Sequence, residues 1–199
     1  GVMHLTSRVF DSVTQKVPNI FSDDDNENKR LTAWYRQLLR LIGLTHDLGH
    51  APFSHASEEL FENGKQHEDY TKDIIFETEV ADYINAIGVK FRSQYGTSYN
   101  ITPELVWMIY EGKDITNEKF IFPDFLFLKS FMDGELDCDK MDYLLRDSLY
   151  CGVTYGKYDL DRFVSTLTAY KHNNQLQLAI ERGGVQALEE FVLARYFMF

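Results

Sequence analysis

The 199-residue sequence predicts a mainly α-helical domain that contains one small β-hairpin. Along most of the chain, apolar residues recur every three or four positions, which is the period of an amphipathic helix. The stretch Leu176–Ile180 instead alternates as a strand does, and Asn173-Asn174 before it is a turn signal. Because 44% of the residues are apolar, a chain of this length can bury a substantial core.

The helical pattern starts at the first residues, since Val2, Leu5, Val9 and Val13 share one face. The acidic stretch 22–28 is predicted to be a solvated loop. It lacks the glycine and the terminal glutamate of a calcium-binding loop. Further helices are predicted at residues 32–45, 56–63, 68–87, 103–112, 124–132, 137–149, 159–169 and 184–199, with the hairpin at residues 168–181.

The predicted helices at the two ends of the chain lack boundary signals. The first helix is already under way at residue 1. The last predicted helix finishes in Tyr196-Phe197-Met198-Phe199, with no cap, glycine or proline after it. We therefore expect residues 1–199 to form a single domain that is truncated at both ends.

The charge balance excludes one class of function. There are 20 Lys and Arg residues against 31 Asp and Glu residues, giving a net charge of −11. A protein that coats DNA or RNA needs the opposite balance, although a local basic pocket for one phosphorylated ligand remains open. No apolar run is long enough for a membrane span. Two cysteines and no secretory signal predict a cytoplasmic protein.

A histidine-rich segment carries the first candidate site. Four of the six histidines fall within 22 positions and stand beside acidic residues. A single histidine on a helix is usually an ordinary core or surface residue, whereas four of them with adjacent carboxylates favour a site for Fe, Mn, Zn, Ni or Co. The residues concerned are His46, Asp47, His50, His55, His67 and Glu68.

The second candidate site lies on the helix predicted at residues 137–149. Asp139, Lys140, Tyr143 and Asp147 occupy one arc of roughly 100° on that helix. Two carboxylates, an ammonium and a phenol suit a metal ligand beside phosphate and sugar contacts. Taken alone, the same face is equally typical of a solvated surface with ion pairs between successive turns.

Two strings together carry a resemblance to a known family. HDLGHAPFSH at residues 46–55 and DKMDYLLRD at residues 139–147 strongly resemble the HD-domain phosphohydrolase superfamily. Within it the chain looks most like the bacterial deoxynucleoside triphosphate triphosphohydrolases and the catalytic domain of the vertebrate HD-domain restriction factor. Matching stretches run from residue 1 to residue 199, so the resemblance implies the helical HD-domain fold.

The resemblance also implies roles for individual residues. His46, Asp47 and Asp139 match ligands of a divalent metal ion, with Mn, Mg, Fe, Zn, Ni and Co all open. The residues that match positions around the reacting phosphate, and are therefore expected to be catalytic, are His50, His55, His67 and Glu68. Those that match substrate contacts to phosphate and sugar are Lys140, Tyr143, Asp147 and Arg195.

Two departures from the family pattern affect these expectations. The family's first metal-binding histidine precedes a Gly-Val pair, and Gly1-Val2 looks like that pair, so we expect this ligand upstream of residue 1. His4 is not its equivalent. Glu58 stands where the restriction factor has an aspartate.

The leading hypothesis is hydrolysis of a dNTP to a deoxynucleoside and inorganic triphosphate. One alternative is an HD phosphatase or phosphodiesterase that acts on another nucleotide, and another is a nucleotide-sensing oligomeric module with little turnover. The resemblance implies a deoxynucleotide substrate, a nucleotide effector and a homo-oligomer as partners.

Overall fold

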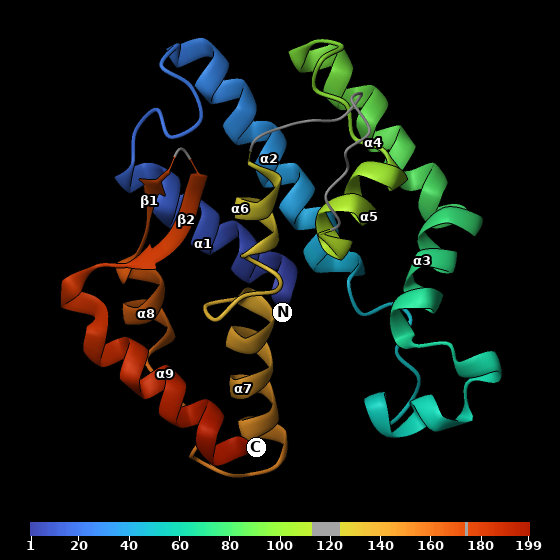
Figure 1. Ribbon diagram of the computed structural model, residues 1–199, viewed down its shortest axis with the longest axis vertical. Coiled ribbons are helices and arrows are strands. Elements are labelled where there is room, and N and C mark those ends of the chain that lie inside the picture. Colours follow the sequence, from blue (N-terminus) through green and yellow to red (C-terminus); the bar gives the residue numbers. More distant parts are fainter. Residues whose placement is uncertain (113–123, 174) are drawn as a thin grey trace.

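Two long antiparallel helices form the centre of the computed structural model, which describes residues 1–112, 124–173 and 175–199 (Figure 1). Helix α1 (Val2–Lys16) packs along α2 (Asp25–Thr45). Their facing side chains include Phe10 and Leu38, both fully buried. The predicted amphipathic faces are thus the faces that form the core.

Helix α2 begins earlier than the sequence pattern predicts. The acidic stretch 22–28, predicted to be a loop, contributes the first turn of α2 from Asp25 onward. Asp24 caps this turn, because its side chain accepts a hydrogen bond from the Glu27 amide at 2.7 Å. Carboxylates at a helix N-terminus interact favourably with the helix dipole, so this acidic run stabilises a helix start.

Aromatic side chains fill the core beside α1 and α2. The short helix α6 (Phe125–Lys129) brings Phe127 to 6.2 Å from the ring of Phe21, which in turn meets Tyr35 edge-on at 4.7 Å. Phe131 lies 5.9 Å from Phe10. These contacts fix the segment that leads into the second candidate site.

On the other side of α2 lie α3 (His67–Glu77), α4 (Glu79–Tyr95) and α5 (Pro103–Glu111). The continuous helix predicted at residues 68–87 is wrong, because Thr78 ends α3 in extended backbone and caps α4 through its hydroxyl. The α-helix predicted at residues 56–63 is replaced by two 3-10 turns, η1 (Ser54–Leu60) and η2 (Glu62–Gly64).

The last third of the chain contains the hairpin and three further helices. Helix α7 (Cys138–Tyr150) leads through α8 (Leu160–Thr166) into β1 (Leu167–His172) and β2 (Gln175–Ile180), which pair antiparallel with Leu167 opposite Ile180. The predicted mainly α fold with one hairpin is confirmed, although Asn174 of the turn lies outside the described residues. A 3-10 turn, η3 (Arg182–Gly184), precedes α9 (Val185–Met198).

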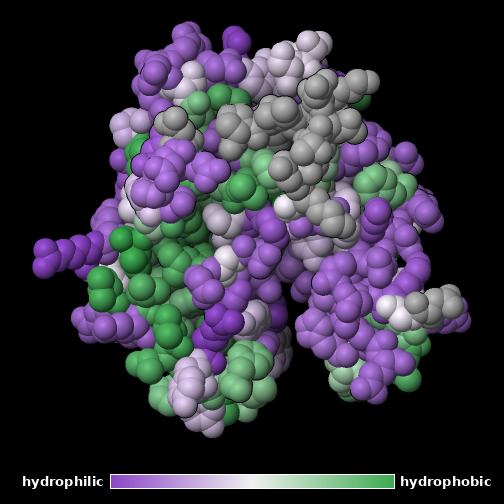
Figure 2. All heavy atoms as spheres, viewed as in Figure 1, coloured by the Kyte–Doolittle hydropathy of each residue, from purple (hydrophilic) through white to green (hydrophobic). Residues whose placement is uncertain are grey.

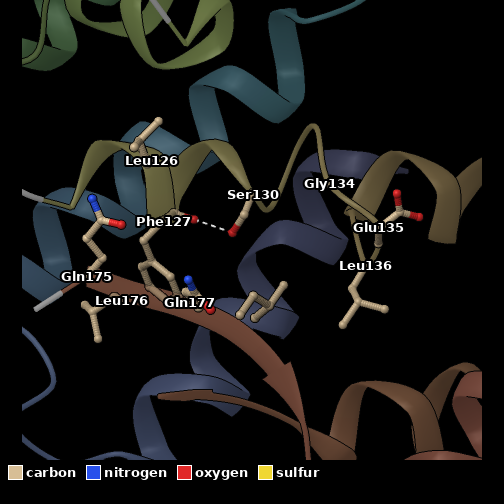
Figure 3. A pocket seen from close by; sticks show the side chains of 10 residues that line it. Leu126, Phe127, Ser130, Gly134, Glu135, Leu136, Gln175, Leu176 and Gln177 are labelled. Atoms are coloured by element: carbon tan, nitrogen blue, oxygen red, sulfur yellow. Dashed lines mark hydrogen bonds between the residues drawn. The ribbon is translucent and has the colours of Figure 1, made fainter. Parts of the chain in front are cut away.

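Two hollows are visible in this fold. A pocket of about 420 Å³ lies between α6, β2 and residues 134–136, with leucine side chains and the Gln175 and Gln177 amides around it (Figure 3). A cleft separates the α7–α9 side of the molecule, which carries many hydrophobic side chains, from the more hydrophilic α3 side (Figure 2). In the part of the chain that the structure describes, no helix has the length and apolarity needed to cross a membrane.

Candidate metal centre

The turn that follows α2 is held tightly against α3. His46 is the C-cap residue of α2, and Gly49 three residues later donates its amide hydrogen to Thr71 Oγ1 at 2.9 Å. The Thr71 hydroxyl also approaches the His46 carbonyl oxygen, at 3.3 Å. Because Thr71 is fully buried, this link fixes the histidine-rich turn relative to the first turn of α3.

Helix α7 supplies a carboxylate to the same turn. Asp139 lies in the first turn of α7, and its Oδ1 is 3.4 Å from His46 Nε2. The Oδ2 atom of Asp47 is 3.3 Å from the same nitrogen. The structure therefore brings together the three predicted metal-binding residues, with one potential ligand atom from each within 4.8 Å of the others.

This cluster has an unusual electrostatic balance. Burial opposes the charged form of His46, but hydrogen bonds to Asp139 and Asp47 outweigh that effect and raise its pKa to about 9. Burial also acts to raise the pKa of Asp47, yet the His46 ring and the other nearby histidines lower it. Two carboxylates around one imidazole thus create a site that favours an added positive charge.

The donor set fits a divalent cation. One imidazole nitrogen and two carboxylate oxygens converge from two helices, which suits Mn, Fe, Co, Ni or Zn. Ligand atoms about 2.1 Å from an ion and at right angles to one another are about 3 Å apart, close to the spacing seen here. The Nδ1 atom of His46 is buried and has no hydrogen-bond partner among the described residues, so the imidazole is not fully committed to protein contacts.

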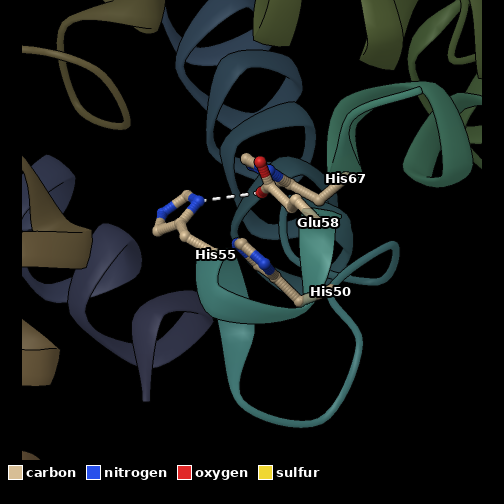
Figure 4. A group of neighbouring side chains, drawn as sticks. All are labelled: His50, His55, Glu58 and His67. Carbon is tan, nitrogen blue, oxygen red and sulfur yellow. Dashed lines mark hydrogen bonds and ion pairs between the residues drawn. The ribbon is translucent and has the colours of Figure 1, made fainter. Parts of the chain in front are cut away.

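A second cluster contains His50, His55, Glu58 and His67 (Figure 4). Glu58 Oε1 is 2.8 Å from His55 Nδ1 and 2.6 Å from His67 Nδ1, so one carboxylate oxygen orients two imidazoles. His50 stacks on His67 with ring centroids 3.8 Å apart. The backbone turns sharply into this arrangement, because Phe53 and Ser54 have φ values of 71° and 51°.

Asp47 connects the two clusters. While its Oδ2 faces His46, its Oδ1 is 3.6 Å from His50 Nε2. Burial and the neighbouring charge of His67 lower the pKa of His50, whereas hydrogen bonds from His55 and His67 lower the pKa of Glu58. At neutral pH, therefore, the second cluster consists of an ionised carboxylate among histidines, one of which resists protonation.

Both clusters open into one pocket of about 670 Å³. All seven residues predicted from the sequence as metal-binding or catalytic lie around it: His46, Asp47, His50, His55, His67, Glu68 and Asp139. The rest of the lining comes from α3, α5 and residues 129–133. It includes residues that no sequence pattern singled out: Lys72, Trp107, Tyr110, Lys129 and Asp133.

The four predicted substrate contacts do not line this pocket, among the side chains found around it. Lys140 forms an ion pair with the buried Asp137 and donates to the Gly134 carbonyl at 3.1 Å. Tyr143 packs edge-on against Phe199 at 5.5 Å. Two longer pairs, at 3.5 Å, hold Asp147 to Arg146 and Arg195 to Glu135. These residues form a neighbouring polar face on α7 and α9.

Glu58 is the functional residue that sequence reasoning leaves without a role. Its position three residues after His55 is a usable signal, because a 3-10 turn places residues i and i+3 on the same side. The contact with His67, nine residues away, depends on the fold of the turns η1 and η2 and has no local signature.

Comparisons with known proteins agree with this geometry. The family model described as "HD domain" matches residues 30–122. An uncharacterized protein of Bacillus subtilis is 30% identical over all of this chain and 38% of its own length. A deoxynucleoside triphosphate triphosphohydrolase SAMHD1 homolog of Dictyostelium discoideum is 28% identical over 76% of this chain and 26% of its own length.

Solved structures show the same fold. A hypothetical protein from Aquifex aeolicus is similar with a TM-score of 0.66 and 35% identity, covering all of this chain and 43% of that one. A phosphohydrolase from Bacteroides thetaiotaomicron is similar with a TM-score of 0.67 and 27% identity. The matched region covers all of this chain and 39% of the Bacteroides chain. The chain thus spans well under half the length of these relatives. The matched model, the His46-Asp47 geometry and these similarities show that the chain contains an HD domain.

Proposed function

We propose that this chain is the site-bearing part of a metal-dependent phosphohydrolase that cleaves dNTPs into a deoxynucleoside and inorganic triphosphate. One observation carries the proposal: the His46–Asp47–Asp139 cluster and the histidine network around Glu58 open into one pocket and share Asp47. A cation site next to oriented imidazoles can catalyse the hydrolysis of a phosphate ester, because the ion activates water and the imidazoles transfer protons. The names of the Dictyostelium and Bacteroides proteins support the reaction class.

A bound divalent ion would polarise a phosphate oxygen and lower the pKa of a nearby water molecule. His46, Asp47 and Asp139 would hold that ion. In the proposed reaction, the water oxygen joins the α-phosphorus, the bond from that phosphorus to the 5′ oxygen breaks, and the 5′ oxygen takes a proton. The triphosphate and the deoxynucleoside then leave separately.

The histidine network can supply that proton. A carboxylate only accepts hydrogen bonds, so the Glu58 contacts place a proton on Nδ1 of both His55 and His67. Each ring then exchanges protons through Nε2. His67 is the better enclosed of the two, with its side chain 12% exposed against 72% for His55, and Glu68 lies 3.3 Å from its ring.

The second candidate is a phosphatase or phosphodiesterase acting on a nucleotide with fewer charges. It is favoured by the acidic pocket lining and by the position of Lys140 and Arg195 away from that pocket.

The expected homo-oligomer and nucleotide effector remain part of the proposal. Exposed apolar side chains on α9, such as Leu193 and Phe197, support an interface, and light scattering after gel filtration tests it.

Product analysis separates these functions. The protein is incubated with each dNTP and with nucleoside monophosphates, in Mn²⁺ or Mg²⁺, and the products are resolved by ion-exchange chromatography. Deoxynucleoside plus triphosphate supports the proposal, whereas monophosphate release supports the second candidate and no turnover supports a sensing module.

A substitution tests the metal site itself. Asp139→Asn should abolish metal binding and turnover together. Asp133→Asn is the matched control, since Asp133 lines the pocket but pairs with Lys129.

A further inference from the structure

The part of the pocket that is lined by Lys72 of α3 and by α5 has its own polar chemistry. Helix α3 contributes Lys72 and α5 contributes Trp107, and the Lys72 ammonium lies over the Trp107 indole at 6.0 Å from the ring centroid. Trp107 is 8% exposed, and its Nε1–H is buried with no hydrogen-bond partner among the described residues. A buried donor without a partner is costly unless a ligand or a water molecule satisfies it.

Lys72 differs from the other lysine around the pocket in having no carboxylate partner among the described residues. Among the described side chains that line it, six are carboxylic acids and two are lysines. Lys129 is occupied, because it pairs with Asp133 at 2.5 Å and approaches the Tyr110 carbonyl at 3.4 Å. In the described part of the chain, no carboxylate forms an ion pair with Lys72.

The cations expected to bind phosphate are engaged elsewhere. Lys140 is held by the buried Asp137, and Arg195 lies beside Glu135 on the neighbouring face of α7 and α9. Of the two lysines among the described side chains around the pocket, Lys72 is therefore the one that is available to pair with an anionic substrate. The indole beneath it limits the positions that the lysine side chain can take, which reduces the entropy lost on binding.

Helix geometry sets the length of the group that Lys72 can reach. Lys72 follows Glu68 by four residues on α3, so it lies on the same helix face about 6 Å further along the axis. A substrate that is hydrolysed next to His67 and Glu68 contacts Lys72 only if its anionic groups extend along α3 from Glu68 to Lys72. A chain of phosphates extends in this way, whereas a single phosphate does not.

We propose that Lys72, which lies over the Trp107 indole, binds the distal phosphates of a polyphosphate substrate. This inference rests on the proposed function and assigns to Lys72 the contact with the phosphates beyond the one that reacts. Lys72 thereby determines specificity, favouring triphosphates over monophosphates.

Calorimetric titration with magnesium tripolyphosphate, and separately with orthophosphate, tests the inference without turnover. We expect Lys72→Met to weaken tripolyphosphate binding at least tenfold, to leave orthophosphate binding unchanged, and to be largely rescued by Lys72→Arg. Lys90→Met is the matched control, because Lys90 is an exposed lysine on α4 that is not among the residues around the pocket, and the change should alter neither affinity. Unchanged thermal melting of all variants shows that they fold.

The possible results keep the two proposals apart. If Lys72→Met binds tripolyphosphate as tightly as the parent, or the parent does not bind it, the role of Lys72 is wrong even when dNTPs are hydrolysed. If the tenfold loss is found but no dNTP is turned over, Lys72 is a polyphosphate-binding residue and the proposed hydrolysis fails. With turnover, the KM for a dNTP should rise at least tenfold in Lys72→Met, with a smaller change in kcat.

Discussion

Gly49 lies against the backbone of Thr71 so closely that a side chain cannot be accommodated. A β-carbon on Gly49 would be 2.4 Å from the Thr71 amide nitrogen and 2.0 Å from the His67 carbonyl oxygen. Both neighbours are backbone atoms of α3, which cannot move aside as a flexible side chain can. This contact therefore joins the metal-binding turn to the helix that carries His67.

Gly49→Ala should accordingly destabilise the protein and disturb the site. We expect the free energy of unfolding in denaturant to fall by about 1–3 kcal/mol, the usual cost of overpacking. Metal affinity should fall as well, because His46 and Asp47 move relative to α7. Gly183→Ala is the matched control, since its β-carbon would meet only the Arg162 guanidinium at 3.7 Å. Equal stability of the two variants would show that the contact is unimportant.

A second prediction concerns the start of α7, where Asp137 has two roles. Its side chain is 1% exposed, accepts a hydrogen bond from the Lys140 amide at 2.7 Å and pairs with the Lys140 ammonium. Asp137→Ala should lower the free energy of unfolding by about 3–5 kcal/mol, because it removes a cap and one partner of an enclosed ion pair.

Asp159→Ala provides the comparison for Asp137. Asp159 caps α8 through the Arg162 amide at 2.9 Å, in an exposed position and with no enclosed ion pair. Its loss should cost only about 1 kcal/mol in the same denaturation measurement. Similar losses in the two variants would mean that the Lys140 pair contributes nothing beyond the cap.

The pKa of His46 predicts how metal binding responds to pH. This pKa is about 9 in the folded, metal-free protein and 6.5 in an unfolded chain. The stability that His46 contributes is therefore fully present below pH 6.5 and is lost as the pH rises through 9. A metal ion must displace the same proton, so its apparent affinity should increase up to about tenfold per pH unit between pH 6.5 and 8.

Calorimetry with Mn²⁺ in buffers of different ionisation enthalpy measures this coupling directly. The expected result is release of about one proton for each ion bound at pH 7, falling toward zero above pH 9. An affinity that does not change between pH 6.5 and 8 would contradict the charged state of His46 in the metal-free site.

Particular residues show how far the sequence could predict this structure. The alternation around Leu176 predicted the hairpin, because strand periodicity is local. Thr78 split a predicted helix, since a threonine hydroxyl can satisfy the free amides of a new helix start better than it serves a helix interior. The sequence strings predicted the ligand triad, whose members the fold then brought together.

The part of the pocket that is lined by Lys72 and Trp107 could not be predicted in this way. Lys72 and Trp107 are 35 positions apart, and each has an ordinary local pattern: one is an exposed helix lysine and the other is an apolar helix position. Their juxtaposition follows from the packing of α3 on α5, which depends on side chains throughout both helices. Likewise, the left-handed backbone at Phe53 and Ser54 that brings Glu58 toward His67 gives no periodic signal.

Glu58 leads to the last prediction, because one oxygen atom orients two imidazoles. Glu58→Gln removes the negative charge and replaces one oxygen with an N–H donor. The remaining amide oxygen is uncharged and accepts weaker hydrogen bonds than a carboxylate, so both rings are held less firmly. Turnover should therefore fall about 10- to 100-fold, as is usual when the partner of a site histidine is lost. The Nδ1–H signals of the two rings in proton NMR, above all that of the better enclosed His67, should weaken, which reports the weakened hydrogen bonds independently of activity.

Glu59→Gln is the matched control for this change. Glu59 is the next residue of the same 3-10 turn and is exposed, so the variant has the same loss of charge without the contacts to the two rings. It should keep both the turnover and the Nδ1–H signals. If Glu58→Gln lowered turnover but kept the signals, the effect would come from charge alone. If it changed neither, the two imidazoles would be oriented by other groups and Glu58 would have no role in the site.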